Sequence, residues 1–291
     1  MTRKYKDLVG DGGSNIAGQV EALTDRLSSR LRQIKRVIAV LSGKGGVGKS
    51  TLTANFAAAW QRMGLNVGVL DADLNGSCMA KLLGVRGYRI QESEQGVEPA
   101  TSPHGIRLMS MDFFMPDEAQ PLIWRGPQSH QHAWRGMVEA NALREMLSDT
   151  HWGRLDVLVL DLPPGGDRIT AVCDTVGPLS GAVVVGLGSE VSQLIVGKSI
   201  RLVRDHLGQE TFGLVTNMRQ YYDPETNRLL PLFDSGTVDP IDLEQLGDVP
   251  FDPRMVGCCD RGVPFVIAHP DAPASIEIRR IAQLVIERGQ S

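Results

Sequence analysis

A glycine-rich segment near the start of the chain has the residue types and spacing of a phosphate-binding loop. It reads Gly-Lys-Gly-Gly-Val-Gly-Lys-Ser from Gly43 to Ser50 and is followed by Thr51. In such a loop the glycines let backbone N–H groups point at phosphate oxygens, a lysine at the position of Lys49 reaches the β- and γ-phosphates, and a hydroxyl at the position of Ser50 ligates Mg²⁺. The segment therefore predicts a site for a nucleoside triphosphate. Its expected nucleotide-binding residues are Gly43, Gly45, Gly46, Val47, Gly48, Lys49, Ser50 and Thr51.

The flanking sequence predicts the elements that would hold this loop. Residues 36–41 form an apolar, β-branched run that is typical of a strand, and apolar residues recur at helical spacing between Ser50 and Met63. The loop would then end at the N-terminus of a helix, where free N–H groups and the helix dipole favour an anion. This order of strand, loop and helix places the phosphates at the end of the strand.

Two further apolar runs end in aspartates that could bind the metal. The first is followed by Asp71-Ala72-Asp73 and the second by Asp161. Because ligands of open α/β sheets bind at the carboxyl ends of the strands, these carboxylates are expected beside the loop. A strand-end aspartate also holds Mg²⁺ in P-loop enzymes. We therefore expect Asp71 and Asp161 to bind Mg²⁺ together with Ser50.

Composition and element order predict one large α/β domain. The chain has 291 residues, of which 42% are hydrophobic, enough for a full core. Strand-like and helix-like segments alternate, which predicts a doubly wound, mostly parallel sheet with helices on both faces, the architecture of P-loop NTPases. We divide the chain into an N-terminal leader with an amphipathic helix (1–35) and a single P-loop domain (36–291). The expected strands are 36–41, 66–70, 106–110, 156–160, 181–187 and 211–216, the expected helices are 49–63, 129–149, 189–207 and 273–288, and residues 88–104 and 219–240 are expected to be irregular.

The charge balance and the hydrophobic pattern argue against several classes of protein. A net charge of −4 does not provide the basic surface of a nucleic-acid-binding protein. No apolar run approaches the length that spans a bilayer, and the first residues lack the apolar core of a signal peptide. The cysteines show no C-x-x-C spacing and fit reduced thiols. We therefore expect a cytoplasmic protein that binds neither nucleic acid nor membrane.

A second lysine, Lys44, precedes the paired glycines and makes the loop a deviant Walker A motif. The motif resembles that of the dimerising ATPases that include MinD, ParA, the nitrogenase iron protein and the Mrp/ApbC iron–sulfur carriers. Within this group the chain is most similar to the Mrp/ApbC branch, over residues 35–288. The similar segments are residues 71–77 with 81–85, residues 109–116, residues 123–127, the Asp-Leu-Pro-Pro-Gly of residues 161–165, Asn217-Met218, and residues 260–264.

The resemblance implies a homodimer that closes through its nucleotide-binding face. Lys44 would reach across the interface to the nucleotide of the partner subunit, in a contact made only when two ATP-loaded subunits meet. Asp73 is similar to the switch I carboxylate that orients the attacking water, and Lys49 would hold the phosphates. Fixed cations of this kind stabilise the charge that develops on the γ-phosphoryl group without a covalent nucleophile. Lys44, Lys49 and Asp73 are therefore the expected catalytic residues.

The resemblance also implies roles for residues that lie far from the loop in sequence. Asp161 is similar to the Walker B aspartate that holds Mg²⁺. Gly165 is similar to the switch II residue whose backbone contacts the γ-phosphate. Asn217 would hydrogen-bond adenine, with Pro250 and Asp252 in the loop beside the base. Together with the P-loop, these residues make up a complete site for ATP and Mg²⁺.

The chain departs from the carrier pattern at the cluster site. The two C-x-x-C positions that follow Asn217-Met218 in the carriers are occupied here by Asp223 and Thr226. Carboxylate and hydroxyl groups are hard ligands, whereas iron–sulfur clusters prefer thiolates. The sequence thus predicts ATP and Mg²⁺ as cofactors without the usual bridging iron–sulfur cluster. Cys258 and Cys259 are the remaining cluster candidates, with one cysteine of each subunit contributing across a two-fold axis.

Two functions remain open at this level. The first is an ATP-switched, dimeric ATPase that acts with an unknown client protein in metallocluster or protein assembly. The alternative is a positioning ATPase of the MinD or ParA type, which binds a membrane, DNA or a partner protein as an ATP dimer. For that alternative, the isoleucines and arginines between Ile276 and Arg288 would provide a membrane-binding helix. A nitrogenase-like reductase is disfavoured, because Pro164 stands where that branch has a cluster cysteine.

Overall fold

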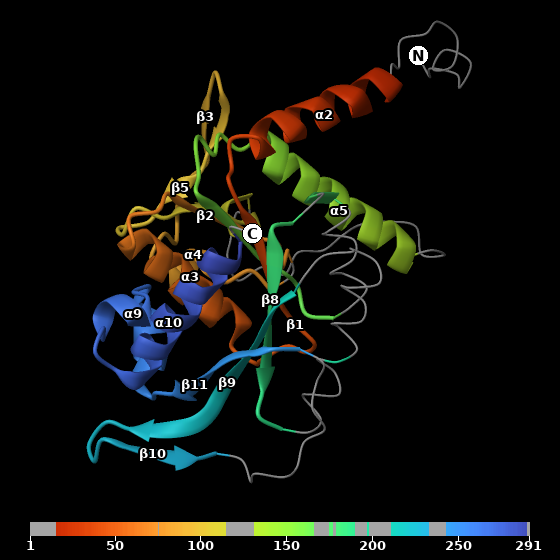
Figure 1. The fold of residues 1–291 in the computed structure, drawn as a ribbon. Coiled ribbons are helices and arrows are strands. Elements are labelled where there is room, and N and C mark those ends of the chain that lie inside the picture. The colour runs from red at the N-terminus through yellow and green to blue at the C-terminus, as the bar shows by residue number, and fades with distance from the viewer. Residues whose placement is uncertain are drawn as a thin grey trace, which may run out of the picture.

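The computed structural model describes residues 16–74, 76–114, 131–165, 175–176, 179–189, 197, 211–232 and 243–289. Figure 1 shows a central sheet with helices packed on both of its faces. The predicted fold class, a mostly parallel α/β sheet, is therefore confirmed. Apart from residues 189 and 197, the helix expected at 189–207 lies outside the described residues.

The main sheet joins strands from most of the described chain. They are β1 (Val37–Ser42), β2 (Val67–Asp71), β5 (Ala100–Thr101), β6 (Arg107–Met109), β7 (Val157–Asp161), β8 (Gly181–Leu187), β9 (Thr211–Asp223), β10 (Arg228–Pro231) and β11 (Gln245–Phe251). Within the described residues their order is β10-β9-β8-β1-β7-β2-β6-β5, and β11 also pairs with β9. Only β5 and β10, at the two ends of this order, run antiparallel to their neighbours. The carboxyl ends of β1, β2 and β7 therefore lie side by side, and this is the edge where a ligand is expected.

Both faces of the sheet are covered because the central strands are apolar on both sides. In β1, Ile38 and Val40 belong to one core and Ala39 and Leu41 to the other. Such a strand can form only between two layers of helices. The first core is covered by α3 (Lys49–Arg62), α9 (Phe265–Ala268) and α10 (Pro273–Arg288). The second core is covered by α2 (Ile16–Leu31) and α5 (Gln131–Asp149). Three short elements lie near the carboxyl edge of the sheet: the helices α4 (Met79–Leu82) and α8 (Arg254–Arg261) and the 3₁₀ turn η1 (Met111–Phe114).

The last helix, α10, buries most of its apolar residues in the core. Ile278, Ile281 and Val285 are fully buried in the first core, and Trp60 of α3 donates a hydrogen bond to a backbone carbonyl of α10. Among its large apolar side chains Ile276 is the exposed one, at 52%, while Leu284 and Ile286 are half-buried. A helix that buries most of its apolar stripe in the core offers little of it to a lipid surface. No helix in the described part of the chain is long and apolar enough to cross a bilayer.

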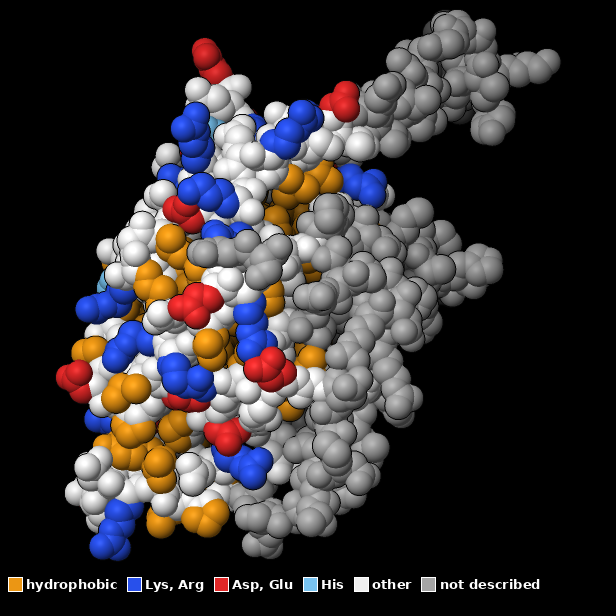
Figure 2. Space-filling view, in the orientation of Figure 1, with side chains coloured by type: hydrophobic (Ala, Val, Ile, Leu, Met, Phe, Trp, Pro, Cys, Tyr) orange, Lys and Arg blue, Asp and Glu red, His pale blue; other side chains and the backbone are white. Residues whose placement is uncertain are grey.

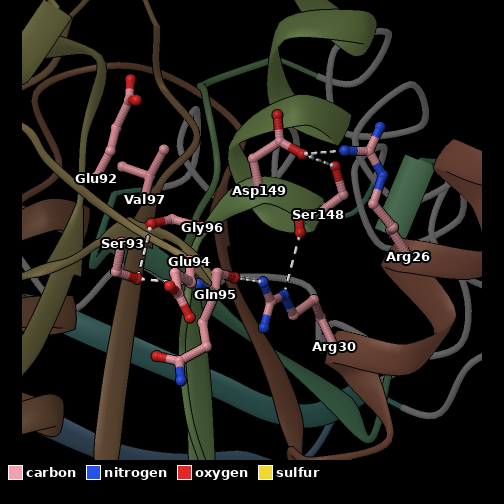
Figure 3. A pocket seen from close by; sticks show the side chains of 10 residues that line it. All are labelled: Arg26, Arg30, Glu92, Ser93, Glu94, Gln95, Gly96, Val97, Ser148 and Asp149. Carbon is pink, nitrogen blue, oxygen red and sulfur yellow. Dashed lines mark hydrogen bonds and ion pairs between the residues drawn. The ribbon is translucent and has the colours of Figure 1, made fainter.

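The helix α2 is tied to the rest of the molecule near its C-terminal end (Figure 3). Leu27 is buried in the second core. Arg30 donates from Nε to the carbonyl of Ser148 at 3.2 Å and from its guanidinium to the carbonyl of Gln95, and Arg26 lies 3.3 Å from the carboxylate at the end of α5. The two arginines reach over a pocket of about 370 Å³ that lies between α2, the end of α5 and the hairpin of β3 (Gln91–Ser93) and β4 (Gly96–Glu98).

Replacing Arg30 with alanine is expected to lower the free energy of unfolding by about 1–2 kcal/mol, because two carbonyls lose their charged donor. Urea unfolding followed by circular dichroism measures the change. Arg32→Ala is the matched control, since Arg32 lies in the turn directly after α2, is exposed, and donates from its side chain to the carbonyl of Ser28 in α2 at 3.3 Å. We expect the control to lower the same free energy by less than about 0.5 kcal/mol. Equal losses in the two variants would show that the contacts of Arg30 do not hold α2.

The prediction of irregular structure was wrong for parts of both insertions. Residues 88–104 contain β3, β4 and β5, and the described part of residues 219–240 contains the end of β9 and all of β10. These strands are hard to recognise because they are short or polar: Arg219 and Gln220 interrupt the apolar run of β9. The turn between β9 and β10 includes Asn227 at φ +55°, a left-handed conformation that asparagine tolerates well.

The hairpin of β9 and β10 forms one end of the sheet and has an apolar outer strand. Leu229 and Leu230 of β10 are 45% and 47% exposed. Figure 2 shows hydrophobic side chains along the lower border of the molecule, where Figure 1 places β10. Pro231 has no N–H group to offer a further strand, which reduces the tendency of such an edge to pair with other chains.

Candidate functional site

The backbone of residues 43–48 has the shape of a phosphate cradle. Gly46 and Gly48 have φ angles of +79° and +82°, in the left-handed region that favours glycine. A side chain at Gly48 would also place its Cβ 2.3 Å from Nδ2 of Asn217. The helix α3 begins at Lys49, directly after this turn, so that the free N–H groups of its first turn face the loop.

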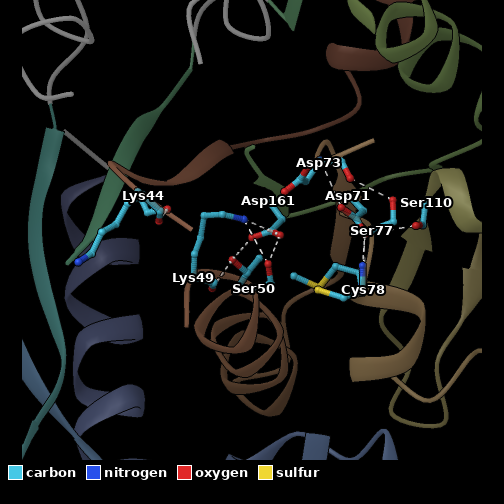
Figure 4. Close-up of polar contacts among 12 residues, drawn as sticks. Lys44, Lys49, Ser50, Asp71, Asp73, Ser77, Cys78, Ser110 and Asp161 are labelled. Atoms are coloured by element: carbon cyan, nitrogen blue, oxygen red, sulfur yellow. Dashed lines mark hydrogen bonds and ion pairs between the residues drawn. The ribbon is translucent and has the colours of Figure 1, made fainter. Parts of the chain in front are cut away.

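A lysine, a hydroxyl and a carboxylate meet at the end of the loop (Figure 4). Nζ of Lys49 lies 2.8 Å from Oδ2 of Asp161, and Oγ of Ser50 donates to the same oxygen at 2.6 Å. Lys49 and Asp161 are both buried, so little water screens their ion pair. Hydroxyl and carboxylate oxygens are the hard ligands that Mg²⁺ prefers. The donor set therefore fits a Mg²⁺ ion that is bound together with phosphate oxygens.

Thr53 belongs to this cluster and was missed from the sequence. Its side chain is fully buried, and its Oγ1 lies 2.7 Å from Oδ1 of Asp161 and 3.0 Å from the carbonyl oxygen of Lys49. The helical spacing of four residues from Lys49 was the available signal, since residues at this spacing lie on one face of a helix. What the sequence did not show was which strand that face would meet.

Asp71, which was expected to bind Mg²⁺, is used mainly by the loop that follows it. It lies in register with Asp161 on the neighbouring strand. Its Oδ2 accepts hydrogen bonds from the N–H groups of Cys78 (3.1 Å) and Met79 (3.2 Å) and from the hydroxyl of Ser110 (3.3 Å). Burial, and next the charge of Asp161, raise the pKa of Asp71 to about 7. The structure thus places Asp161 at the Ser50 hydroxyl, while Asp71 anchors the loop of residues 72–78.

Asp73 and Gly165 follow β2 and β7 and so lie at the same edge of the sheet. The carbonyl of Asp73 accepts the N–H of Gly76 and the hydroxyl of Ser77, both at 3.1 Å, which makes a tight turn. Gly165 has a φ of +98°, and its N–H lies 3.4 Å from the carbonyl of Ser42 at the end of β1. Both residues are therefore held beside the loop that was expected to bind phosphates.

Lys44 points away from the phosphate end of its own subunit. Figure 4 shows its side chain extending in the opposite direction from Lys49, Ser50 and Asp161. Its carbonyl accepts the hydroxyl of Ser42 at 3.0 Å, which fixes the start of the loop. The second lysine of the motif is therefore directed at something other than the phosphates of its own site.

The other end of the site is a small pocket beside Asn217. Nδ2 of Asn217 donates to the carbonyl of Val47 at 2.8 Å and thereby ties β9 to the loop. The pocket has a volume of about 80 Å³. Its lining is mostly apolar and comes from Thr51, Asn217, Met218, Pro250, Phe251, Met255, Val256 and Cys259. An apolar slot of this kind suits the flat face of a base.

Asp252 was expected beside the base and is placed behind the pocket. It is fully buried, and its two oxygens accept hydrogen bonds from the side chain of Arg254 at 2.9 and 2.7 Å. Oδ1 also accepts the N–H of Arg254 at 3.0 Å, at the start of α8. Its observed partners therefore stabilise the helix that lines the pocket, whereas Pro250 contributes to the lining itself.

Of the two positions at which the resemblance led us to expect cysteines, Asp223 ends β9 and Thr226 lies in the exposed turn before β10. Oδ2 of Asp223 accepts the hydroxyl of Thr226 at 2.6 Å, and Oδ1 accepts the N–H of Glu225 at 3.0 Å. The hydrogen bond from Thr226, followed by the one from Glu225, lowers the pKa of Asp223. A pair of mutually hydrogen-bonded oxygen side chains therefore occupies the place of the thiolate pair.

Cys258 and Cys259 do not form a cluster site within the subunit. Cys258 is fully buried in the first core, and Sγ of Cys259 lies 3.9 Å from Oγ1 of Thr51. Burial raises the pKa of both thiols, which disfavours the thiolate that iron needs. Among the described residues, no group of three or more histidine, cysteine, aspartate or glutamate side chains is placed to hold a metal ion.

Comparison with known proteins identifies the family of the chain. Residues 33–286 match the family described as ParA, NUBPL iron-transfer P-loop NTPase. An iron–sulfur cluster carrier protein of Saccharolobus solfataricus is 36% identical over 92% of this chain and 89% of its own length, and one of Methanococcus maripaludis is 36% identical over 95% and 94%. Among solved structures, an ADP complex of a nucleotide-binding protein from Archaeoglobus fulgidus has 31% identity and a TM-score of 0.68, and covers 82% of this chain and 90% of its own.

A more distant likeness supports the fold. MinD of Aquifex aeolicus, in its complex with MinC, has a TM-score of 0.62 at 21% identity and covers 87% of this chain and 96% of its own. At this identity the likeness shows only that the elements are arranged alike. The family match covers most of the chain, including the loop and both strand-end aspartates. Two relatives are 36% identical in sequence to this chain over nearly their whole length. The chain belongs to the ParA family of NUBPL-type iron-transfer P-loop NTPases.

Proposed function

We propose that the protein is a Mg²⁺-dependent ATPase that hydrolyses ATP to ADP and phosphate and uses the reaction as a conformational switch. The observation that carries the proposal is the meeting of Lys49, Ser50 and Asp161 at the N-terminus of α3. A cation, a hydroxyl and a carboxylate at a helix N-terminus together suit a triphosphate with its metal. The pocket beside Asn217 would take the adenine.

The chemistry follows from where charge develops during phosphoryl transfer. Lys49 would leave Asp161 for the β- and γ-phosphate oxygens, and Ser50 and Asp161 would hold Mg²⁺, which neutralises phosphate charge when bound. The N–H of Gly165 would donate to the γ-phosphate. Asp73 would orient the attacking water. Once nucleotide is bound, these groups would be fixed around the γ-phosphate before the chemical step, which is how such sites stabilise a transition state.

Lys44 supports a dimer that closes over the nucleotide. Its side chain is directed away from the phosphate end of its own subunit. In a face-to-face pair related by two-fold symmetry, such a lysine would reach the partner's nucleotide, and the reverse contact would follow by symmetry. We propose that ATP closes this homodimer and that turnover is slow until a client protein binds.

The turn at Asp223 and Thr226 supports a function without the usual bridging cluster. Both side chains are oxygen ligands and are bonded to one another rather than presented as thiolates. We propose that the protein has kept the ATP-driven closure of its carrier relatives and applies it to a client protein in metallocluster or protein assembly. Cytoplasmic location is part of this proposal.

Replacing Asp73 with alanine is expected to separate binding from hydrolysis. Because the expected role of Asp73 is to orient water, Asp73→Ala should bind ATP with near-unchanged affinity while phosphate release falls by about 10²–10³-fold. Phosphate release and the affinity for a fluorescent ATP analogue are measured on the same preparation. Full turnover by Asp73→Ala would exclude this role. If the wild-type protein shows no ATP-dependent phosphate release at any protein concentration, with or without extract as a source of client, the ATPase proposal fails.

A further inference from the structure

We propose that Thr53 is a positioning residue for Mg²⁺ binding, because its hydroxyl holds one oxygen of Asp161 and leaves the other facing Ser50. The inference deepens the proposed ATPase function and rests on it. Thr53 lies in α3, beyond the glycine-rich motif, and has no part in that motif. Its side chain would touch neither nucleotide nor metal, so it would act only through Asp161.

The contacts divide the carboxylate of Asp161 into two halves with different partners. Oδ2 is shared by Ser50 at 2.6 Å and Lys49 at 2.8 Å, whereas Oδ1 is held by Thr53 at 2.7 Å. Lys49 and Ser50 would both change partners on ligand binding, because Lys49 is expected to bind the phosphates and Ser50 is expected to bind Mg²⁺. Of the three contacts to Asp161, the hydrogen bond from Thr53 is the one that would remain when nucleotide and metal bind. It is therefore suited to keep the carboxylate oriented before and after binding.

The single proton of the hydroxyl has two acceptors in reach. Besides Oδ1 of Asp161, Oγ1 of Thr53 lies 3.0 Å from the carbonyl of Lys49, one helical turn earlier. A hydroxyl has only one proton to donate, and a bond to a charged carboxylate is shorter and stronger than one to a carbonyl. The shorter distance, 2.7 Å, is the one to Asp161. Donation to Asp161 therefore dominates.

Burial makes the loss of this bond costly for the carboxylate. Thr53 and Asp161 are both completely buried, so bulk solvent has no access to replace the hydroxyl. Without it, Oδ1 would lack a charge-assisted donor, and the carboxylate would turn towards the donors on its other side. Such a turn would move Oδ2 away from Ser50, and the two oxygens that would hold Mg²⁺ would no longer be presented together.

Two substitutions separate the hydroxyl from the shape of the side chain. Thr53→Val keeps the branched shape and removes the hydroxyl, and Thr53→Ser keeps the hydroxyl and removes the methyl group. We would measure binding of a fluorescent ATP analogue as free Mg²⁺ is varied, and also in EDTA. We expect Thr53→Val to raise the Mg²⁺ concentration for half-maximal binding about tenfold, the effect of one charge-assisted hydrogen bond, and Thr53→Ser to stay within about twofold of wild type. Binding in EDTA should stay the same in all three proteins.

The outcomes distinguish positioning from packing. An unchanged Mg²⁺ requirement in Thr53→Val, or a serine variant as impaired as the valine variant, would overturn the role of the hydroxyl. A parallel loss of binding in EDTA and of melting temperature would show that Thr53 only stabilises the fold. If Thr53→Val does not accumulate in folded form, Thr53→Ala is compared with Thr53→Ser in its place. Failure of the wild-type protein to bind the analogue at any Mg²⁺ concentration would instead count against the proposed ATPase function.

Discussion

Lys49→Ala is expected to abolish ATP binding and turnover at working concentrations of nucleotide. In the structure the ammonium group of Lys49 lies 2.8 Å from Asp161, poised at the N-terminus of α3 where the phosphates would sit. Removing it takes away the only cation that the loop directs at its own phosphate site in the described residues. Loss of one such preorganised group lowers the rate constant by about 10²–10³-fold, and weaker binding adds to this in kcat/KM. Phosphate release and equilibrium binding of a fluorescent ATP analogue measure the two effects.

The matched control for this prediction is the other lysine of the same loop. Lys44→Ala should leave binding of the analogue to the single subunit near wild type, because Lys44 points away from its own site. It should instead reduce the part of turnover that rises with protein concentration. Because Lys49→Ala also breaks a buried ion pair, melting temperatures are recorded without nucleotide. Tight ATP binding by a folded Lys49→Ala protein would contradict the site, and identical behaviour of the two variants would contradict the assignment of different roles.

The parts of the site that could be predicted from the sequence are those in which chemistry and local geometry coincide. The loop, the strand before it and the helix after it are contiguous, so spacing alone places Lys49 and Ser50 at a helix N-terminus. Asp161 could be expected nearby because it ends an apolar strand, and parallel strands bring their carboxyl ends to one edge. The observed contact between Ser50 and Asp161 spans 111 positions and still follows from these two rules.

The parts that could not be predicted depend on strand register and on which donors lie within hydrogen-bonding distance of each carboxylate. Asp71 and Asp161 end neighbouring strands and look equivalent in sequence, yet Asp71 is taken up by the N–H groups of Cys78 and Met79. Nothing in the local sequence distinguishes Thr53 from other residues of its helix, and its role appears only when β7 is packed against α3. These assignments need the relative position of two elements to within a few ångströms, which no local pattern contains.

The turn between β9 and β10 shows the converse case, in which the sequence identified the positions and the structure supplied their geometry. Asp223 and Thr226 were recognised as departures from a cysteine pair without any indication of how they lie. Their side chains prove to be within hydrogen-bonding distance, Oδ2 to Oγ1 at 2.6 Å. Cysteine side chains at these two positions, three residues apart, could bind iron together, because thiolates are the soft ligands that iron–sulfur clusters prefer. The observed difference from the expected cysteine pair is thus one of ligand chemistry, and a double cysteine variant tests whether the backbone of the turn can hold a cluster.

Asp223→Cys combined with Thr226→Cys is accordingly expected to create a cluster site. The turn is exposed at Thr226 and only partly covered at Asp223, so the two substitutions should cost little stability beyond the loss of their mutual hydrogen bond. Each subunit would then offer two thiolates, and two subunits would supply the four that a bridging cluster takes. Anaerobic reconstitution with iron and sulfide, followed by the visible absorption of the cluster and by gel filtration, should show iron bound to a dimer in the double variant.

The wild-type protein and each single variant are the controls, and all are expected to bind far less iron than the double variant. Adding Cys259→Ser to the double variant tests whether the native half-buried thiol contributes, and we expect the cluster to persist because that thiol lies beside Thr51, away from the turn. A stable cluster in the wild-type protein would contradict the proposal that cluster carriage has been lost. Failure of the folded double variant to bind iron would mean that more than two side chains separates this protein from its carrier relatives. If the cluster does form, the turn provides the geometry for cluster binding, and the choice of oxygen over sulfur at two positions accounts for the proposed loss of cluster carriage.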